Sequence, residues 1–284
     1  MHDIVASLEY DEITDPTVLL DGDGNIKLWY LPGAIDPMHQ KNVWDSLNLL
    51  RAPLEESIKK LCNHGWRNDW LLFHETTDLV GSIDLSPGWY QQGHGPPDFH
   101  PKVSRLLKSG REHNGMQQWV NEMSEFHVLL SGTLAIIHPW MYAAGWEALI
   151  RLNMEVKQWE DVDMSSILPS WNSIYNSMSI MVNHATPYHM DINRQELWLD
   201  MLVTVGDYPP LGFVMPTLNL WFHYNPGTVI AMSGSALEHR VGHTNSNHAC
   251  LAYYMHHNVH QSVSVQLCLL PNLTDLEPLI NVNS

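Results

Sequence analysis

The stretch NHATPYHMD, residues 183–191, provides the starting point for interpreting the rest of the chain. His189 and Asp191 are two residues apart, and alternate residues of a β-strand point to the same face, so both side chains can reach one metal ion. A third ligand must come from a later strand, and His239 in SGSALEHRVGH supplies it. Two imidazoles and one carboxylate on one face of a metal characterise non-haem Fe(II) oxygenases. Because the chain has 18 histidines, a chance HxD triplet is the alternative.

Short apolar runs broken by Gly, Pro and Asn follow Pro169 and predict a region rich in β-strands. The six runs are SIMVNHATPYH, WLDMLVTVGDYPP, LGFVMP, NLWFHYNPGTVIAMSG, ALEHRVGH and HACLAYYMHHNV. Strands at such close spacing are typical of a sandwich or barrel. No internal repeat, low-complexity tract or linker divides the chain, so one domain covering residues 1–284 is expected.

The first half of the chain combines a strand-like pattern with two helix-like patterns of apolar residues. Residues 1–15 are acidic and are expected to be loose, and DGDG at 21–24 predicts a hairpin turn before the strand IKLWYL. Apolar residues recur every three or four positions over 36–62, which predicts an amphipathic helix interrupted near Pro53. Residues 116–151 are also expected to be helical.

Residues 81–101, GSIDLSPGWYQQGHGPPDFHP, predict a strand that runs into a long ordered loop. Trp89, Gln92 and His94 in this loop could stack on and hydrogen-bond a planar ligand. The alternative is an aromatic lid over the core.

The formal net charge of −17 argues against a nucleic-acid partner, because non-specific affinity for DNA comes mainly from Lys and Arg. After Ser165 the only cationic side chains are Arg194 and Arg240. A local exception is a series spaced by three residues, which predicts one side of a short helix: Lys102, Arg105, Lys108 and Arg111. This series is the best phosphate-binding candidate, and an ordinary solvated face is the alternative.

Targeting signals and cysteine chemistry give little direction. There is no apolar run of about 18 residues, so no membrane span is expected. The start MHDIVASLEYDEITD fits neither a secretory signal nor a transit peptide, which favours an intracellular location.

The three cysteines are odd in number and widely spaced, so we expect them to be reduced core residues: Cys62, Cys250 and Cys268. Nothing in the sequence indicates the oligomeric state.

Several stretches together resemble the fungal branch of the TET/JBP family of Fe(II)- and 2-oxoglutarate-dependent DNA dioxygenases. The most specific are WLDMLVTVGDYPP, YNPGTVIAMSGSALEHRV and ACLAYYMHHNVH, and IKLWYLPG, GSIDLSPGWYQQGH, LAIIHPWMYAAG and MSIMVNHATPYHMD agree with them. The resemblance spans about residues 26–260. It implies an α+β fold with a mainly β core, namely a double-stranded β-helix or jelly roll. Helices, outer strands and the substrate loop over 16–168 would flank a metal-binding core at 169–265.

The resemblance also implies roles for individual residues. His189 and Asp191 match the HxD pair of the family, and His239, which Val241 follows as in the family pattern, matches the distal ligand. His243 is the alternative for that position.

Two positions depart from the family pattern. The family usually places an Arg five residues before the HxD histidine and another about ten after the distal one, but His184 and His248 stand there. We expect these two histidines, with Asn183, to bind 2-oxoglutarate. Because Arg is always charged and binds carboxylates in a bidentate manner, the replacement predicts weaker, pH-dependent binding, or ascorbate as another reductant. Arg240 is a second possible cation, although adjacent strand residues face opposite ways.

The activity implied is oxidation of the methyl group of 5-methylcytosine or N6-methyladenine in DNA, with 2-oxoglutarate and O2 as co-substrates. The base would have to flip out of the duplex, and Trp89, Gln92, His94, Arg194 and His257 are the expected pocket residues. A DNA substrate would imply a nuclear location, although no basic localisation run is present. The alternatives are a dioxygenase of the same fold acting on a small molecule and a catalytically silent binding module.

Overall fold

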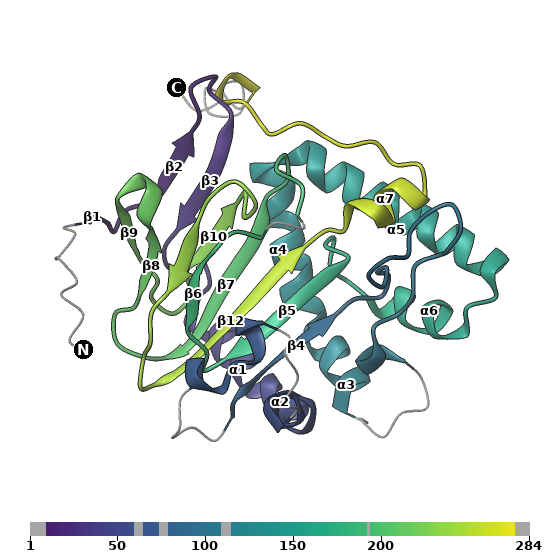
Figure 1. Ribbon diagram of the computed structural model, residues 1–284, viewed down its shortest axis with the longest axis horizontal. Helices are drawn as coiled ribbons and strands as arrows, with labels where there is room; N and C mark the ends of the chain where they lie inside the picture. The colour runs from purple at the N-terminus through teal and green to yellow at the C-terminus, as the bar shows by residue number, and fades with distance from the viewer. Residues whose placement is uncertain (1–9, 60–64, 74–78, 109–114, 192–193, 276–284) are drawn as a thin grey trace.

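The computed structural model describes residues 10–59, 65–73, 79–108, 115–191 and 194–275. Two β-sheets lie face to face, and a layer of helices covers the outer face of the larger sheet (Figure 1). Among these residues no helix is long and apolar enough to cross a membrane.

The larger sheet has seven strands and forms the centre of the molecule. In spatial order its strands are β2 (Thr17–Leu20), β3 (Ile26–Leu31), β10 (Val229–Met232), β7 (Asp200–Asp207), β12 (Asn247–Tyr254), β5 (Ser177–Val182) and β4 (Gly81–Leu85). All neighbours pair antiparallel.

The smaller sheet has five strands and carries the candidate metal ligands. Its spatial order is β1 (Asp11–Ile13), β9 (Leu220–His223), β8 (Gly212–Met215), β11 (His239–Val241) and β6 (Thr186–His189). Two facing sheets in this topology form the expected jelly-roll core. The region after Pro169 contains eight strands instead of six, because two of the apolar runs each bend into two strands, β5 with β6 and β9 with β10.

Alternation of side chains along the strands builds two cores. Met201 and Val203 of β7 point toward the helices, whereas Leu202 between them packs against the smaller sheet. In β12, Leu251 packs toward the helices and Cys250 toward the smaller sheet. A period of two therefore separates a core between sheet and helices from one between the sheets.

The helical layer comes mainly from the part of the chain before residue 168. Its helices are α1 (Pro37–Ser46), α2 (Arg51–Lys59), α3 (Gly115–Glu122), α4 (Ser124–Ile137), α5 (Pro139–Trp159) and α6 (Val162–Ile167), and α7 (His257–Ser262) follows the last strand. Asp36 caps α1 by accepting hydrogen bonds from the backbone of Met38 and His39, with Pro37 in the first turn, where proline is tolerated.

Four expectations are tested here. The DGDG hairpin is confirmed, because β2 and β3 pair and Asp21 Oδ1 accepts hydrogen bonds from the backbone of Asp23 and Asn25. The break in the first helical segment lies in a 3₁₀ turn at Leu47–Leu50, not at Pro53, which falls in the first turn of α2. The strand and loop over 81–101 and the helices over 116–151 are confirmed.

The expectation of a loose segment up to residue 15 was wrong for its described part. Asp11–Ile13 form β1, which pairs in parallel with Leu220–Phe222 of β9, and this long-range pairing is invisible in a local acidic sequence. Cys250 is a buried free thiol and Cys268 is a partly buried one, as expected. Cys62 lies outside the described residues.

Candidate metal centre

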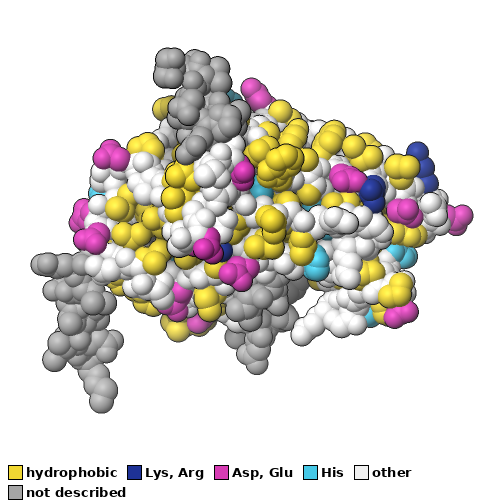
Figure 2. Space-filling model, turned by 90° about the horizontal axis from the view of Figure 1, so that it is seen from above, with side chains coloured by type: hydrophobic (Ala, Val, Ile, Leu, Met, Phe, Trp, Pro, Cys, Tyr) yellow, Lys and Arg dark blue, Asp and Glu magenta, His cyan; other side chains and the backbone are white. Residues whose placement is uncertain are grey.

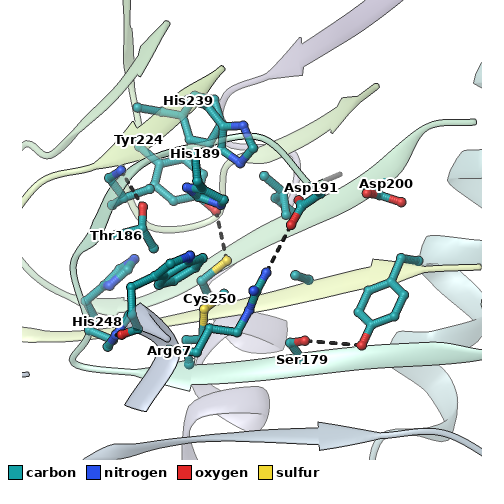
Figure 3. A pocket seen from close by; sticks show the side chains of 18 of the residues that line it. Arg67, Ser179, Thr186, His189, Asp191, Asp200, Tyr224, His239, His248 and Cys250 are labelled. Atoms are coloured by element: carbon teal, nitrogen blue, oxygen red, sulfur yellow. Dashed lines mark hydrogen bonds and ion pairs between the residues drawn. The ribbon is translucent and has the colours of Figure 1, made fainter. Parts of the chain in front are cut away.

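Three ligand atoms converge at one end of the smaller sheet. His189 ends β6, His239 begins β11, and the two residues are directly paired across the antiparallel ladder. Asp191 follows β6 by two residues. One ligand atom from each of these side chains lies within 4.8 Å of the others (Figure 3), which brings the sequence-predicted triad together.

The hydrogen bonds of the two imidazoles present the correct nitrogen to a metal. His189 Nδ1 lies 2.9 Å from the carbonyl of Pro187, and His239 Nδ1 lies 2.9 Å from that of Leu237. A carbonyl can only accept, so each Nδ1 carries the proton and each Nε2 keeps a free lone pair. Burial lowers the pKa of His189 and lowers that of His239 to about 4, so both rings are neutral at pH 7. This donor set fits Fe(II).

Asp191 is held through its side chain and through its backbone. Arg67 Nη2 lies 3.0 Å from Asp191 Oδ1, and the backbone N–H of Asp191 donates to the carbonyl of Gly234 at 2.9 Å. A Cβ at position 234 would lie 3.0 Å from Asp191 Oδ2, so a larger residue there would press on the carboxylate. The aspartate is thereby oriented before any metal binds.

Arg67 and Trp66 are site residues that the sequence did not reveal. The Trp66 ring centroid lies 4.5 Å from that of His189, and the Arg67 guanidinium carbon lies 4.3 Å over the Trp66 ring. Both residues lie in a short 3₁₀ turn, Trp66–Asn68, more than 120 residues before the triad. No local periodicity could have indicated a contact over that separation.

An inner cavity extends from the triad into the space between the two sheets. Its wall includes His184 and His248 together with Thr186, Phe213 and Cys250. The expected cofactor residue Asn183 lies outside this wall. Its side-chain amide donates to the carbonyl of Leu79 at 2.7 Å and accepts from the backbone of His248 at 2.8 Å, so it holds the strand ends together.

The two histidines that stand at the usual arginine positions are not equivalent to arginine. His184 Nε2 lies 3.2 Å from the carbonyl of Trp66, and burial lowers its pKa to about 4, so the ring is neutral at pH 7. His248 packs edge-on against Tyr208 and Tyr224, with ring centroids 4.9 and 6.1 Å away. Neutral imidazole can donate one hydrogen bond but does not neutralise a carboxylate.

Two arginines supply positive charge to the described wall of the inner cavity, Arg67 and Arg194. Arg194 places its guanidinium carbon 3.2 Å from the centroid of the Tyr254 ring, and its Nε lies 3.8 Å from Asp200 Oδ2. Burial raises the pKa of Asp200 to about 7. Arg240 instead lies 4.5 Å over the Tyr188 ring and outside the cavity wall, as the alternation of strand side chains predicted.

A wider outer cleft of about 1000 Å³ adjoins the inner cavity. Its wall contains every residue expected to bind substrate: Trp89, Gln92, His94, Arg194 and His257. The two cavities share five residues: Arg67, Ser179, Asp191, Arg194 and Tyr254. The metal ligand Asp191 therefore faces both compartments.

The basic series does not form the expected helix. Lys102 pairs with Trp89 in an isolated β-bridge, Arg105 begins a single 3₁₀ turn that ends at Leu107, and Arg111 lies outside the described residues. Lys102 Nζ lies 3.6 Å from Asp161, and Arg105 Nη2 lies 3.8 Å from Glu56. On the face seen in Figure 2, acidic side chains are widely scattered and most Lys and Arg side chains lie toward one end.

Comparison with known proteins decides the family. The model of the TET/JBP family, the oxygenase domain of the 2-oxoglutarate and Fe(II)-dependent dioxygenase superfamily, matches residues 86–257. The chain belongs to the TET/JBP family. It is therefore an Fe(II)- and 2-oxoglutarate-dependent dioxygenase. Within the described residues, the candidate iron site is the cluster of His189, Asp191 and His239. His243 is not part of this cluster.

The similarity to one solved structure, with a TM-score above 0.5, supports the fold. The chain is similar to NgTET1 in complex with 5mC DNA, with 14% identity, a TM-score of 0.55, and coverage of 88% of this chain and 84% of that one. The viral collagen prolyl hydroxylase of Paramecium Bursaria Chlorella virus-1 is 8% identical over 83% of this chain and 97% of its own, with a TM-score of 0.33. No curated protein matches the chain.

Proposed function

We propose that this enzyme oxidises the methyl group of a methylated DNA base, 5-methylcytosine or N6-methyladenine. The observation that carries the proposal is the position of Asp191 in the walls of both cavities. A co-substrate in the inner cavity and a base in the outer cleft would then meet at the same metal. The similarity to NgTET1, whose structure contains 5mC DNA, supports this choice of substrate, and the resemblance noted above favours the fungal branch.

The residues of the inner cavity would hold 2-oxoglutarate. When bound with Fe(II), this co-substrate would supply two electrons through its oxidative decarboxylation to succinate and CO2, and O2 would be the oxidant of the substrate C–H bond. Arg67 would supply positive charge to its carboxylates, while His184 and His248 would contribute hydrogen bonds. Asn183 would act indirectly, because its amide fixes the backbone of His248. This assignment needs no protonated histidine.

The loop after β4 would hold the base. Trp89, Gln92 and His94 offer an aromatic surface and polar groups on one side of the outer cleft, and His257 lies on the wall as well. A base flipped out of a duplex is bound by this combination of stacking and edge hydrogen bonds. A DNA substrate would place the enzyme in the nucleus.

A small-molecule substrate is the second candidate, and the charges favour it. The net charge of −17 repels phosphate, and carboxylates already pair with Lys102 and Arg105 near the cleft. A free methylated base or nucleoside would use the same cleft without these cations.

Product analysis with matched substrates separates the two candidates. The enzyme is supplied with Fe(II), 2-oxoglutarate and either duplex DNA with one 5-methylcytosine or N6-methyladenine per strand, or the corresponding free nucleosides. Oxidised base in DNA, with binding that weakens steeply as salt rises, supports the proposal. Oxidation of the nucleosides without oxidation of DNA would show that the substrate is the small molecule and not DNA. Succinate formation without oxidised base in either set would exclude both. The His189→Ala variant is the control for metal-independent product.

A further inference from the structure

We propose that Asp84 selects bases that carry an exocyclic amino group, so that 5-methylcytosine and N6-methyladenine are accepted and thymine is rejected. The inference rests on the proposed function and deepens it. It assigns specificity to a residue of β4, outside the metal triad and outside the loop from Trp89 to His94.

Asp84 is the exposed residue of strand β4. Gly81, Ser82, Ile83 and Leu85 are buried, whereas Asp84 is exposed in the wall of the outer cleft. It is directly paired with Ser179 of β5 in the antiparallel ladder. The hydroxyl of Ser179 donates a hydrogen bond to Asp84 Oδ1, which fixes the carboxylate at this position.

Ser179 connects Asp84 to the reaction centre. It lines both cavities, and its Oγ lies 3.4 Å from the Tyr254 hydroxyl. The ring of Tyr254 in turn lies under the guanidinium of Arg194. Ser179 and Tyr254 therefore connect the carboxylate of Asp84 to the guanidinium of Arg194, and Ser179, Tyr254 and Arg194 line the junction that Asp191 occupies.

The two charged groups differ in hydrogen bonding. An ionised carboxylate only accepts, and after the bond from Ser179 it retains capacity for further donors. A guanidinium only donates. The wall therefore offers an acceptor at Asp84 and a donor at Arg194.

The pairing edge of an amino-bearing base has the complementary order. Cytosine presents its N4 amino donor beside the N3 acceptor, and N6-methyladenine presents its one remaining N6–H beside the N1 acceptor when its methyl group points to the N7 side. Thymine presents the O4 acceptor beside the N3–H donor, which reverses the order and sets two acceptors, O4 and Asp84, against each other. In cytosine the amino group is also on the carbon next to the one that carries the methyl group. A methyl group directed toward Asp191 therefore brings the amino group to the neighbouring wall.

Exchange of the carboxylate for an amide tests the proposal, because Asn has the same shape but can donate as well as accept. Binding is measured without O2, in the presence of Fe(II) and 2-oxoglutarate, with labelled duplexes that carry 5-methylcytosine or thymine opposite an abasic site. We expect the unchanged protein to prefer 5-methylcytosine by about tenfold or more. Asp84→Asn should remove or invert this preference. Asp45→Asn, which alters an exposed carboxylate of α1, should leave it unchanged.

The outcomes separate failure of the inference from failure of the proposed function. A preference for 5-methylcytosine that persists in Asp84→Asn, or its absence from the unchanged protein, overturns the role of Asp84 and leaves DNA oxidation standing. If neither duplex binds, DNA is not the substrate, and 5-methyl-2′-deoxycytidine and thymidine are compared in the same way. Equal affinity for these nucleosides, or binding of neither, overturns the inference as well.

Discussion

Arg67 Nη2 lies 3.0 Å from Asp191 Oδ1, so an arginine from a separate turn orients the carboxylate of the candidate iron site. Arg67 lies outside the family-matched residues 86–257, yet it lines both cavities. It combines two roles in one side chain, because it positions a metal ligand and supplies positive charge where the family usually relies on other arginines.

Replacement of Arg67 by Gln should weaken Fe(II) binding by about 10- to 100-fold, the usual effect of losing a group that orients a metal ligand. The 2-oxoglutarate affinity should fall as well, because a cation leaves the inner cavity. Anaerobic titration with Fe(II) and then 2-oxoglutarate measures both. Arg240→Gln is the matched control, since Arg240 lies over Tyr188 outside the cavity. Equal affinities of the two variants for Fe(II) and 2-oxoglutarate would show that Arg67 does not support the site.

Removal of a triad ligand should abolish metal binding and turnover. His189→Ala or Asp191→Ala is expected to reduce Fe(II) affinity by more than about 100-fold, beyond the loss expected for a supporting group. His243→Ala should retain both properties, because His243 is outside the ligand cluster. Metal content after anaerobic loading and succinate production are the measurements. Loss of iron in His243→Ala with retention in His239→Ala would reverse the assignment of the distal ligand.

Buried histidines should make the protein less stable in acid. Burial among Trp119, Trp171 and Tyr253 lowers the pKa of His127 to about 3, whereas the unfolded chain has the ordinary value of 6.5. The unfolded state therefore binds the proton first as pH falls. The contribution of His127 to stability is complete above pH 6.5 and is lost progressively toward pH 3, with about 2 kcal/mol gone at pH 5.

The variant His127→Phe keeps an aromatic ring that does not titrate. Its free energy of unfolding should fall less between pH 7 and pH 5 than that of the unchanged protein, as measured by urea denaturation at each pH. Other buried histidines act in the same direction in both proteins, so only the difference between the two slopes is informative. Parallel slopes would show that His127 does not titrate as its burial implies.

The start of β4 depends on glycine. Gly81 has φ +146°, and a Cβ there would lie 2.2 Å from the carbonyl oxygen of Leu54 in α2. Gly81→Ala should therefore destabilise the protein by about 3 kcal/mol. Gly22→Ala is the control, since nothing lies within 4 Å of its Cβ position, and it should change stability by about 0.5 kcal/mol or less. Equal thermal midpoints for the two variants would contradict the close packing of α2 on β4.

Local pattern was enough to predict the elements that carry the metal ligands. The HxD spacing predicted His189 and Asp191 as ligands, and the later run ending in HRV predicted His239, although only the two histidines lie in strands and Asp191 follows β6 by two residues. The five residues expected to bind substrate also share one cleft. What could be inferred from the sequence alone was therefore the chemistry of short segments and the identity of the family.

Contacts between distant segments were not predictable in the same way. The pairing of β1 with β9 and the contact of Arg67 with Asp191 each join segments far apart in sequence, with no repeated pattern to indicate them. The protonation state of the two histidines at the expected arginine positions could not be predicted either. Burial of His184 keeps its ring neutral, and burial is a property of the folded chain that the position in the motif does not reveal.

The shared wall around Asp191 has a consequence for the order of events during turnover. Because a base in the outer cleft would abut the inner cavity through Arg67, Ser179 and Tyr254, it would obstruct the passage between the two compartments. We expect 2-oxoglutarate to enter before the base, and succinate to depart after the oxidised base has left. Excess base should then slow turnover by trapping succinate, and product release would limit the rate.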